Sequence, residues 1–448
     1  MKIRLKAQSD GSVMVATLLT SMIVGIGVAS FLMMVSNQNY STMRSLAWNA
    51  ATPLAEAGIE EALTHLNDDS SLTANNWSSQ LINGQTVYQK RRDFVGDGSY
   101  YRVTISNANS PVIFSEASAP GPLGRRNVSR NIRVTTVPNG LYRPAIFVKQ
   151  GIDLGNDFLL DSFDSTSPDS STNGKYDAAK VKANGNLASI STAAGAVNIQ
   201  DSKIFGHMYT PPSGGYRLGN NGMVGDQAFQ SASANAGTVQ PGYYSGDLNT
   251  TIPDATPPAG WQSFSYPPGG LINGVSYKCI LASGSYQLPP GTTLTGNVLV
   301  VGDATLYVPQ DGSIQFGSGD GITISSSLGA TLKLYNASST DAVLSNLSND
   351  SGMATRFTYY GLPTTAGTKA TFAGGATAFA GTIYAPNQDI VVTGPASGNQ
   401  DFIGAITANS VTVSGHNSMH FDEALAKSGG SPRIVIDSYA EVASSAGF

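Results

Sequence analysis

The segment Phe379-Ala-Gly-Thr-Ile-Tyr-Ala385 recurs as Phe402-Ile-Gly-Ala-Ile-Thr-Ala408, with an offset of 23 residues (402 minus 379). The triplet Val392-Thr-Gly394 then recurs as Val413-Ser-Gly415, with an offset of 21 residues (413 minus 392). Repeats of this length are typical of stacked units that bury a shared core. They predict a β-solenoid of the right-handed β-helix type, with two or three short strands in each coil of about 21–23 residues.

A second pattern, N-terminal to these repeats, favours the same fold. Apolar residues two positions apart point to the same face of a strand. Such pairs recur here in steps of 8, 8, 8 and 10 residues, at Val298/Val300, Leu306/Val308, Ile314/Phe316, Ile322/Ile324 and Leu332/Leu334. The Gly, Asn and Asp residues between them suit tight corners. A β-sandwich also has strands every 8–12 residues and is the alternative fold for this half of the chain.

Near the start of the chain, Val13–Val35 (VMVATLLTSMIVGIGVASFLMMV) contains no charged residue. A helix of this length reaches roughly 34 Å, which is enough to cross a hydrocarbon layer of ~30 Å. The run is too long for a cleavable signal peptide, whose apolar region has about 7–15 residues. Bases at Lys2, Arg4 and Lys6 precede the run, and the next base is Arg44. The positive-inside rule therefore predicts a cytoplasmic N-terminus and a periplasmic or extracellular remainder.

The basic leader ends at Gly11, and Ser12 begins the apolar run. This arrangement resembles the class III signal of type IV pilins and pseudopilins, in which a peptidase cuts after the glycine. The resemblance implies processing between Gly11 and Ser12. The chain departs from most members of that family at Ala16, where they carry a glutamate five residues after the cut. An uncleaved anchor is therefore the alternative.

Apolar residues at a spacing of three to four predict that the helix continues to about Asn67, with a kink at Pro53. Gly96-Asp-Gly98 is a strong hairpin signal. A helix packed on an antiparallel sheet would form a small α+β head. The strands of this sheet are expected at Thr86–Val95, Ser99–Ser106, Val112–Glu116 and Ser129–Val137.

Two stretches resemble known families. AEAGIEEAL (Ala55–Leu63) resembles the N-terminal region of PilX-type accessory pilus assembly proteins, over roughly residues 8–67. This resemblance implies a pilin-like head, and Glu56, Glu60 and Glu61 would either pair with a neighbouring subunit or form a solvated helix face. The distal half resembles a bacterial domain of unknown function that often follows PilX-like N-termini. The residues that carry this second resemblance are LKLYNA (Leu332–Ala337), YYGLP (Tyr359–Pro363), GTIYAPN (Gly381–Asn387) and HFDEAL (His420–Leu425).

The expected organisation is mainly β, with a long N-terminal helix, a pilin-like α+β head and a distal β-solenoid. Its segments are a basic leader (1–11), a transmembrane helix (12–35), the stalk helix and small antiparallel sheet (36–137), a first solenoid part (138–209), a Gly/Pro/Ser-rich linker or long loop (210–274), a second solenoid part (275–430) and a C-terminal tail (431–448).

Composition excludes several classes of protein. Only 12% of the residues are charged, and the net charge of −5 shows no basic face of the kind that nucleic-acid binding needs. The single cysteine, Cys279, excludes an intramolecular disulfide framework and a Cys-rich metal module.

Two clusters of side chains are candidate metal sites. His416, His420 and Asp422 are weak candidates for zinc, because no H-E-x-x-H motif is present; hydrogen-bonded histidines are the alternative. The aspartates between 153 and 169 could hold calcium, but they lack the spacing of a calcium loop, and turn formation is the commoner explanation for such aspartates. These aspartates are Asp153, Asp157, Asp161, Asp164 and Asp169.

These observations predict a membrane-anchored structural protein rather than an enzyme, with no cofactor and no catalytic residue. It would be a pilin-like accessory subunit of a type IV pilus or a type II secretion-like system. Its expected partners are the lipid bilayer, other pilin-type subunits packed along the helix near Gly25 and Gly27, and a surface carbohydrate or protein. The alternatives are an anchored adhesin unrelated to pili and a tethered polysaccharide-active enzyme.

Overall fold

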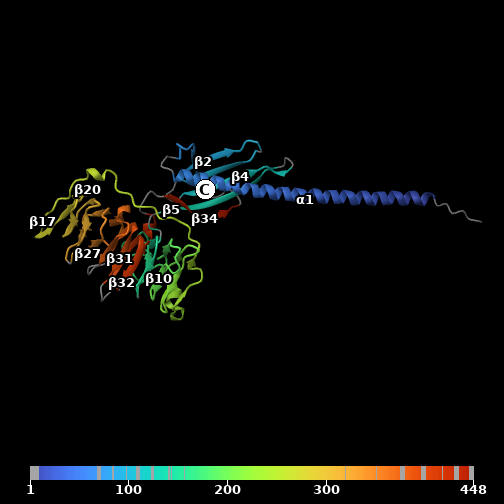
Figure 1. The fold of residues 1–448 in the computed structure, drawn as a ribbon. Helices are drawn as coiled ribbons and strands as arrows, with labels where there is room; N and C mark the ends of the chain where they lie inside the picture. Colours follow the sequence, from blue (N-terminus) through green and yellow to red (C-terminus); the bar gives the residue numbers. More distant parts are fainter. Residues whose placement is uncertain are drawn as a thin grey trace, which may run out of the picture. The chain divides into compact units, whose positions relative to one another are not determined.

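The computed structural model describes residues 10–442, except 68–71, 83–84, 97, 107–110, 123–125, 140–141, 143, 156, 318, 350, 374–378, 395–399, 416 and 428–432. The chain is mainly β, with one long N-terminal apolar helix, α1 (Asp10–Leu66), as the sequence predicted. It divides into two compact units (Figure 1). Unit 1 comprises residues 1–138 and 433–448, and unit 2 comprises residues 139–432.

Unit 1 is an antiparallel sheet covered by the C-terminal part of α1. The sheet order is β1-β2-β3-β4-β5-β34, and the expected hairpin joins β2 to β3 with Asp93 opposite Tyr100. The helix continues through Pro53, and its buried residues Ala51, Ala55, Ile59 and Ala62 form one core with the sheet. The strands are β1 (Ser78–Ile82), β2 (Gln85–Asp93), β3 (Tyr100–Ser106), β4 (Val112–Ala119), β5 (Val128–Asn139) and β34 (Arg433–Glu441).

The C-terminal end of the chain differs from the sequence-based expectation. Residues 431–448 were expected to form a tail, but strand β34 occupies the edge of the unit 1 sheet beside β5. The Asn67 side chain holds β34 by accepting a hydrogen bond from the Ile434 N–H and donating one to the Ile434 carbonyl oxygen. The β-branched run Ile434-Val435-Ile436 has high strand propensity, which explains why it pairs once an edge is available.

Unit 2 consists of short strands that pair in parallel with strands about one coil away along the chain. Its first part contains helix α2 (Gln227–Ser231) and the strands β6 (Ile146–Val148), β7 (Ile152–Asp153), β8 (Leu159–Phe163), β9 (Leu187–Ser189), β10 (Val197–Gln200), β11 (Lys203–Phe205), β12 (Met208–Tyr209), β13 (Tyr216–Leu218), β14 (Met223–Gly225), β15 (Thr238–Val239) and β16 (Tyr244–Ser245).

The second part of unit 2 follows the same scheme. Its strands are β17 (Gly270–Ile272), β18 (Val275–Tyr277), β19 (Cys279–Leu281), β20 (Gly284–Gln287), β21 (Thr293–Leu294), β22 (Val298–Val300), β23 (Asp303–Val308), β24 (Ser313–Ile314), β25 (Ile322–Ile324), β26 (Thr331–Asn336), β27 (Ala342–Ser345), β28 (Ser348–Asn349), β29 (Phe357–Gly361), β30 (Lys369–Ala373), β31 (Phe379–Thr393), β32 (Gln400–Ser414) and β33 (Asn417–Asp422).

The sequence repeats lie directly on one another. Strands β31 and β32 pair in parallel, with Phe379 opposite Phe402 and Val392 opposite Val413. A register shift between Ala385 and Asp389 absorbs the change in offset from 23 to 21 residues. Both residues of each of the five apolar pairs are buried. An ordinary β-sandwich needs antiparallel sheets, whereas the only antiparallel strand pair recorded among the described residues of unit 2 is the hairpin β17–β18.

The order of coils in the stack differs from their order in the chain. Strand β32 pairs with β31 on one side and with β6 and β7 on the other, and β33 pairs with β8. The last coil of the second part (400–422) therefore lies on the first coil of the first part (146–163). We call this contact the junction. One hydrophobic core runs through it, from Tyr142 to Leu425.

The range 210–274, expected to be a linker or long loop, is largely folded into this stack. Strands β14 and β16 pair in parallel with β11 and β12, so residues 216–245 continue the first part. Residues 246–264, which we call the strap, then lead to the second part. Ile252 and Ala255 of the strap are buried in the core, and Trp261 stacks on Tyr307 with ring centroids 4.4 Å apart. Strands of two or three residues among Gly, Pro and Ser are too short to show a periodic pattern in the sequence. The sequence therefore predicted a loop where the structure has strands.

Candidate functional site

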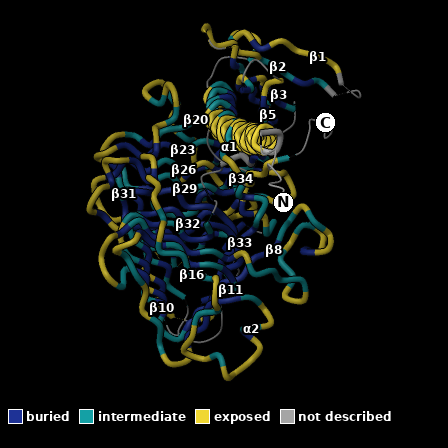
Figure 2. The backbone as a smooth tube through the Cα atoms, turned by 90° about the vertical axis from the view of Figure 1, so that its right-hand side faces the viewer, coloured by how far each residue is buried: buried dark blue, intermediate teal, exposed yellow. Residues whose placement is uncertain are grey.

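The N-terminal part of α1 is apolar around its whole circumference. Its large hydrophobic side chains from Val13 to Met34 are 52% to 74% exposed, and Figure 2 shows this part of the helix as exposed. Within the helix, the Thr17 and Ser21 hydroxyls donate to backbone carbonyl oxygens of the preceding turn, at 3.0 and 2.7 Å. These bonds hide polar groups from an apolar surrounding. Among the described residues, α1 is the one helix that is long and apolar enough to span a membrane.

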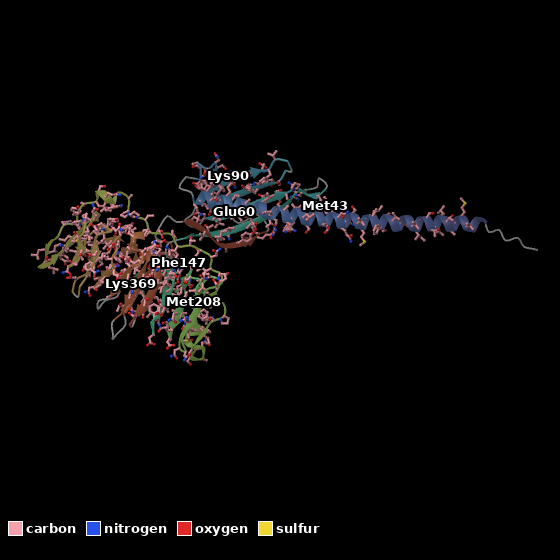
Figure 3. All side chains as sticks on the ribbon, in the orientation of Figure 1. Met43, Glu60, Lys90, Phe147, Met208 and Lys369 are labelled. Atoms are coloured by element: carbon pink, nitrogen blue, oxygen red, sulfur yellow. The ribbon has the colours of Figure 1, made fainter. Side chains whose placement is uncertain are left out.

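The next part of α1, residues 36–50, also exposes apolar side chains. Met43 is 43% exposed, Leu46 62% and Trp48 42% (Figure 3 labels Met43). Trp48 lies 13 residues after Val35, which places it about 20 Å further along a helix. The interfacial layer outside the hydrocarbon core is only about 5–8 Å thick on each side. If Val13–Val35 fills the core, these side chains lie beyond the lipid.

The AEAGIEEAL motif packs within the chain. Gly58 brings the helix so close to the sheet that an added Cβ would lie 2.6 Å from the Ser115 Oγ and 2.7 Å from the Val103 Cγ2. A Cβ essentially never lies this close to a non-bonded atom, so a larger residue would have to displace these side chains or the helix. Ala55, Ile59 and Ala62 complete the buried face. The small residues of the motif therefore determine how α1 docks on the sheet.

The three glutamates of this region have different environments. Glu61 accepts a hydrogen bond from the Tyr101 hydroxyl at 2.5 Å and pairs with the Lys90 ammonium at 2.9 Å. Burial alone would raise the pKa of Glu61, but the hydrogen bonds from Tyr101 and Lys90 outweigh it and lower the pKa. Glu56 and Glu60 are exposed. One of the three expected partner-binding glutamates is thus used inside unit 1.

His420, a weak metal candidate, lies at the junction in a buried polar cluster. Its Nδ1 is 2.6 Å from the Asp161 Oδ1, and its Nε2 is 3.5 Å from the Asp401 Oδ1. The Tyr176 ring stacks on the imidazole at 3.6 Å, and its hydroxyl donates to the Asp161 Oδ2 at 2.9 Å. Burial alone would lower the pKa of His420, but the bonds to Asp161 and Asp401 raise it. Both nitrogens of the ring are therefore engaged by carboxylates.

Asp422, another metal candidate, does not join this cluster. Asp422 accepts hydrogen bonds from the backbone N–H groups of Ser165 and Ala424, at 3.0 and 3.1 Å, and burial raises its pKa. Within the described part of the chain, no group of three or more His, Cys, Asp or Glu side chains could hold a metal ion. His416 lies outside the described residues.

The aspartates considered for calcium are also spread over separate interactions. Asp153 accepts from the side chains of Asn198 and Gln200, at 2.7 and 3.0 Å. Asp164 accepts from Thr166 within its own turn, and Asp157 has a positive φ of 62°. Asp161 binds His420 instead. Corner formation and coil-to-coil bonding therefore account for the aspartates whose contacts are described.

The expected processing site lies at the start of α1, which begins at Asp10 and includes Gly11 and Ser12. The side chains of these two residues are outside the described set. Sequence reasoning missed Tyr176 and Asp401, because nothing in the local sequence connects them with His420. Only the stacking of distant coils brings the four side chains together.

Comparisons with known proteins cover parts of this architecture. A family model described as a domain of unknown function (DUF7305) matches residues 263–428, which is less than half of the chain. No curated protein sequence matches the chain. Among solved structures, the chain is similar to the competence-associated pilin ComZ from Thermus thermophilus, with 11% identity over 88% of this chain and 96% of that chain. The TM-score of 0.25 does not establish a shared fold.

Proposed function

We propose that this protein is a membrane-anchored structural subunit of the pilin-like, PilX-related kind. Residues 13–35 would lie in the cytoplasmic membrane with the N-terminus in the cytoplasm, and both units would be displayed on the other side. The proposal takes unit 2 as a β-solenoid that serves as an extended scaffold or adhesive surface. It assigns the chain to a type IV pilus or a type II secretion-like system, without a catalytic role.

The continuity of α1 carries the proposal. A single helix passes from an exposed section that is apolar all round to a section whose small residues pack on the unit 1 sheet. A helix without a polar face would be insoluble in water but is stable in a bilayer, where its backbone groups are satisfied internally. The same helix therefore serves as a membrane anchor and as part of a folded head.

The exposed side chains of residues 36–50 support partner subunits along the helix. Met43, Leu46 and Trp48 lie beyond the expected lipid boundary and stay 42% to 62% exposed, although the Arg130 guanidinium lies 5.1 Å from the centre of the Trp48 ring. Further back, an added Cβ at Gly25 or Gly27 would meet nothing within 4 Å. Small residues in a membrane helix allow another helix to approach closely. Pilin-type helices packed side by side would cover both regions.

A non-enzymatic role agrees with the state of the acidic and basic groups in unit 2. His420 and Asp161 are buried and bind each other across the junction, and Tyr176 donates to the same aspartate. A general base needs a nitrogen or oxygen free to reach a substrate. Holding two coils in register is the role that these contacts support.

Two experiments test the proposal. Membrane fractionation of the full-length protein from its native cells should place it in the membrane fraction, and intact-mass analysis should give a chain that starts at Ser12 if a prepilin peptidase acts. A soluble full-length chain would refute the anchor. Retention of Met1 on a membrane-bound protein would favour the plain adhesin.

Subunit packing is tested with single cysteines. Leu46→Cys should form disulfide-linked species with itself or with other cysteine-labelled helices in membranes, whereas Lys333→Cys, on an exposed position of β26, should not. The native Cys279 is buried and will not compete. The absence of crosslinks at Leu46, with efficient labelling of the thiol by a water-soluble maleimide, would contradict helix packing.

A further inference from the structure

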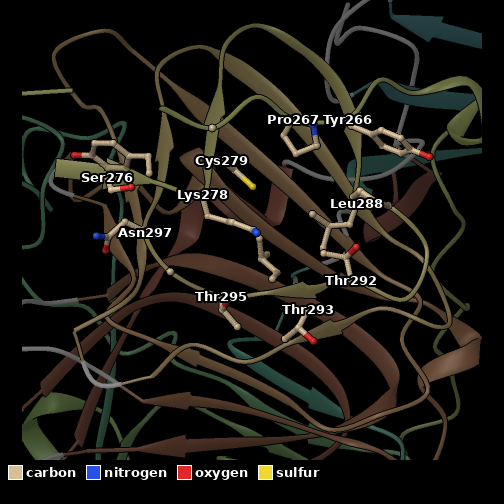
Figure 4. Close-up of a pocket in the computed structure, with 15 residues that line it drawn as sticks. Tyr266, Pro267, Ser276, Lys278, Cys279, Leu288, Thr292, Thr293, Thr295 and Asn297 are labelled. Atoms are coloured by element: carbon tan, nitrogen blue, oxygen red, sulfur yellow. The ribbon is translucent and has the colours of Figure 1, made fainter. Parts of the chain in front are cut away.

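A cavity of about 680 Å³ lies beside the first coil of the second part of unit 2. One wall comes from the β17–β18 hairpin and the segment before it, and the other from residues 288–297 (Figure 4). Two backbone bonds hold the walls: the Lys278 N–H donates to the Asn297 oxygen at 2.8 Å, and the Ile280 N–H donates to the Pro268 oxygen at 2.7 Å. The size is that of a small-ligand site, and the walls are formed without a ligand.

The accessible lining of this cavity combines apolar and polar surface and carries one positive charge. Cys279, Leu288 and Leu294 form an apolar floor, but they are only 2%, 3% and 0% exposed, so a ligand can reach little of it. The remaining surface combines the apolar parts of proline, tyrosine and threonine side chains with hydroxyl and amide groups and one ammonium group. These polar side chains belong to Tyr266, Ser276, Tyr277, Lys278, Thr292, Thr293, Thr295 and Asn297.

Lys278 is the charged residue of this lining. In Figure 4 its ammonium group points into the middle of the cavity, between Cys279 and the threonine side chains. No ion pair of Lys278 is recorded in the part of the chain that the structure describes. Asp320 is the acidic group bound to the lining backbone, accepting from the Gly296 N–H at 3.2 Å, but its side chain does not line the cavity. The cavity therefore complements an anion.

We propose that this cavity binds an acidic oligosaccharide. Lys278 would pair with a sugar carboxylate, and the hydroxyls of Thr292 and Thr295 would hydrogen-bond to ring hydroxyls. Tyr266, which is 58% exposed at the cavity, offers an aromatic face to the apolar side of a pyranose ring. A small inorganic anion would leave most of the volume unfilled. This site goes beyond the proposed function, because it holds whether or not the helix joins a filament.

The test uses the full-length protein in detergent and isothermal titration with tetragalacturonate. Its methyl ester is the matched neutral ligand, and hexaglutamate is the matched non-sugar anion. We expect tetragalacturonate to bind and each control ligand to bind at least about tenfold more weakly. Lys278→Gln should lower the affinity for tetragalacturonate at least about tenfold and leave the weak binding of the methyl ester unchanged. Tyr266→Ala should lower the affinity for both tetragalacturonate and its methyl ester.

Lys333→Gln is the control variant, because Lys333 is an exposed lysine that does not line the cavity. This control variant should bind tetragalacturonate with the affinity of the unmodified protein. All variants should have the same melting temperature as the unmodified protein. Binding that Lys278→Gln leaves unchanged would overturn the proposal, as would equal affinity for the methyl ester or for hexaglutamate. No heat of binding at millimolar tetragalacturonate would overturn it as well. None of these outcomes affects the membrane-anchor proposal.

Discussion

Replacing Gly404 by alanine should break the contact between the two repeated strands. Gly404 has a φ of +151°, and its register partner on β31 is Gly381. A Cβ built at Gly404 would overlap the Gly381 carbonyl oxygen and lie 2.9 Å from the Gly381 carbonyl carbon. Backbone atoms in the middle of a parallel pair cannot rotate away. The strands would have to separate or shift.

Two terms set the size of this effect. An alanine in a backbone conformation that is normal only for glycine costs about 1–3 kcal/mol. Overpacking against atoms that cannot move costs about 1–3 kcal/mol more. Together they predict a loss of about 2–6 kcal/mol in the stability of unit 2. For a domain of this size, about 2 °C per kcal/mol gives a melting temperature lower by about 4–12 °C.

Gly367→Ala is the matched control. Gly367 also has a positive φ, of +80°, but an added Cβ there meets nothing within 4 Å. This variant should lose only the backbone term, about 1–2 kcal/mol, or about 2–4 °C. Scanning calorimetry of the detergent-solubilised protein measures both, and hydrogen exchange of β31 and β32 locates the loss. Equal melting temperatures for the two variants would refute the predicted clash between the coils.

Three further predictions concern other parts of the molecule. Gly58→Ala should destabilise unit 1 by about 1–3 kcal/mol in chemical denaturation, although the same change in a free helix stabilises by about 1 kcal/mol; a gain in stability would contradict the close helix–sheet contact. His420→Gln should lower the melting temperature more at about pH 5.5 than at about pH 9. The pKa of His420 is raised in the folded protein, so the stability that the protonated ring contributes is complete below the ordinary pKa of histidine and is lost as pH rises through the folded-state pKa. An equal loss of melting temperature at both pH values would exclude the ion pair with Asp161. Val300→Asp should lower the free energy of unfolding by several kcal/mol, because it buries a carboxyl group in the core, whereas Leu299→Asp at the neighbouring, half-exposed position should lower it far less. An equally small loss for both variants would place Val300 outside the core.

The apolar pattern of the sequence was sufficient to predict the elements that depend on local periodicity. The 23-residue repeat and the paired valines and leucines indicated stacked parallel strands, because residues two apart share a face and equal offsets align equal faces. Val13–Val35 likewise identified the apolar helix by length alone. These signals are local or strictly repeated, so one sequence contains them completely.

The junction and its polar cluster could not be predicted in this way. Asp161 and His420 are 259 residues apart, and the sequence around either residue contains no pattern that predicts contact with the other. The order of coils depends on which exposed strand edges pair, and parallel edges of similar composition have no distinct signature. His416 and His420 suggested a metal site because they are close in sequence. The partners of His420 instead come from a different coil.

The junction has a consequence for how the chain folds as it is made. Strands β6 and β8 are synthesised early, but their neighbours β32 and β33 follow about 260 residues later, and β34 joins the unit 1 sheet later still. Until then, an incomplete chain has open strand edges in both units, and such edges readily pair with other chains. A premature stop anywhere before residue 400 would therefore leave two unfinished sheets rather than a shorter version of the protein. Nearly the entire polypeptide must therefore be kept from pairing with other chains before its last coil is made.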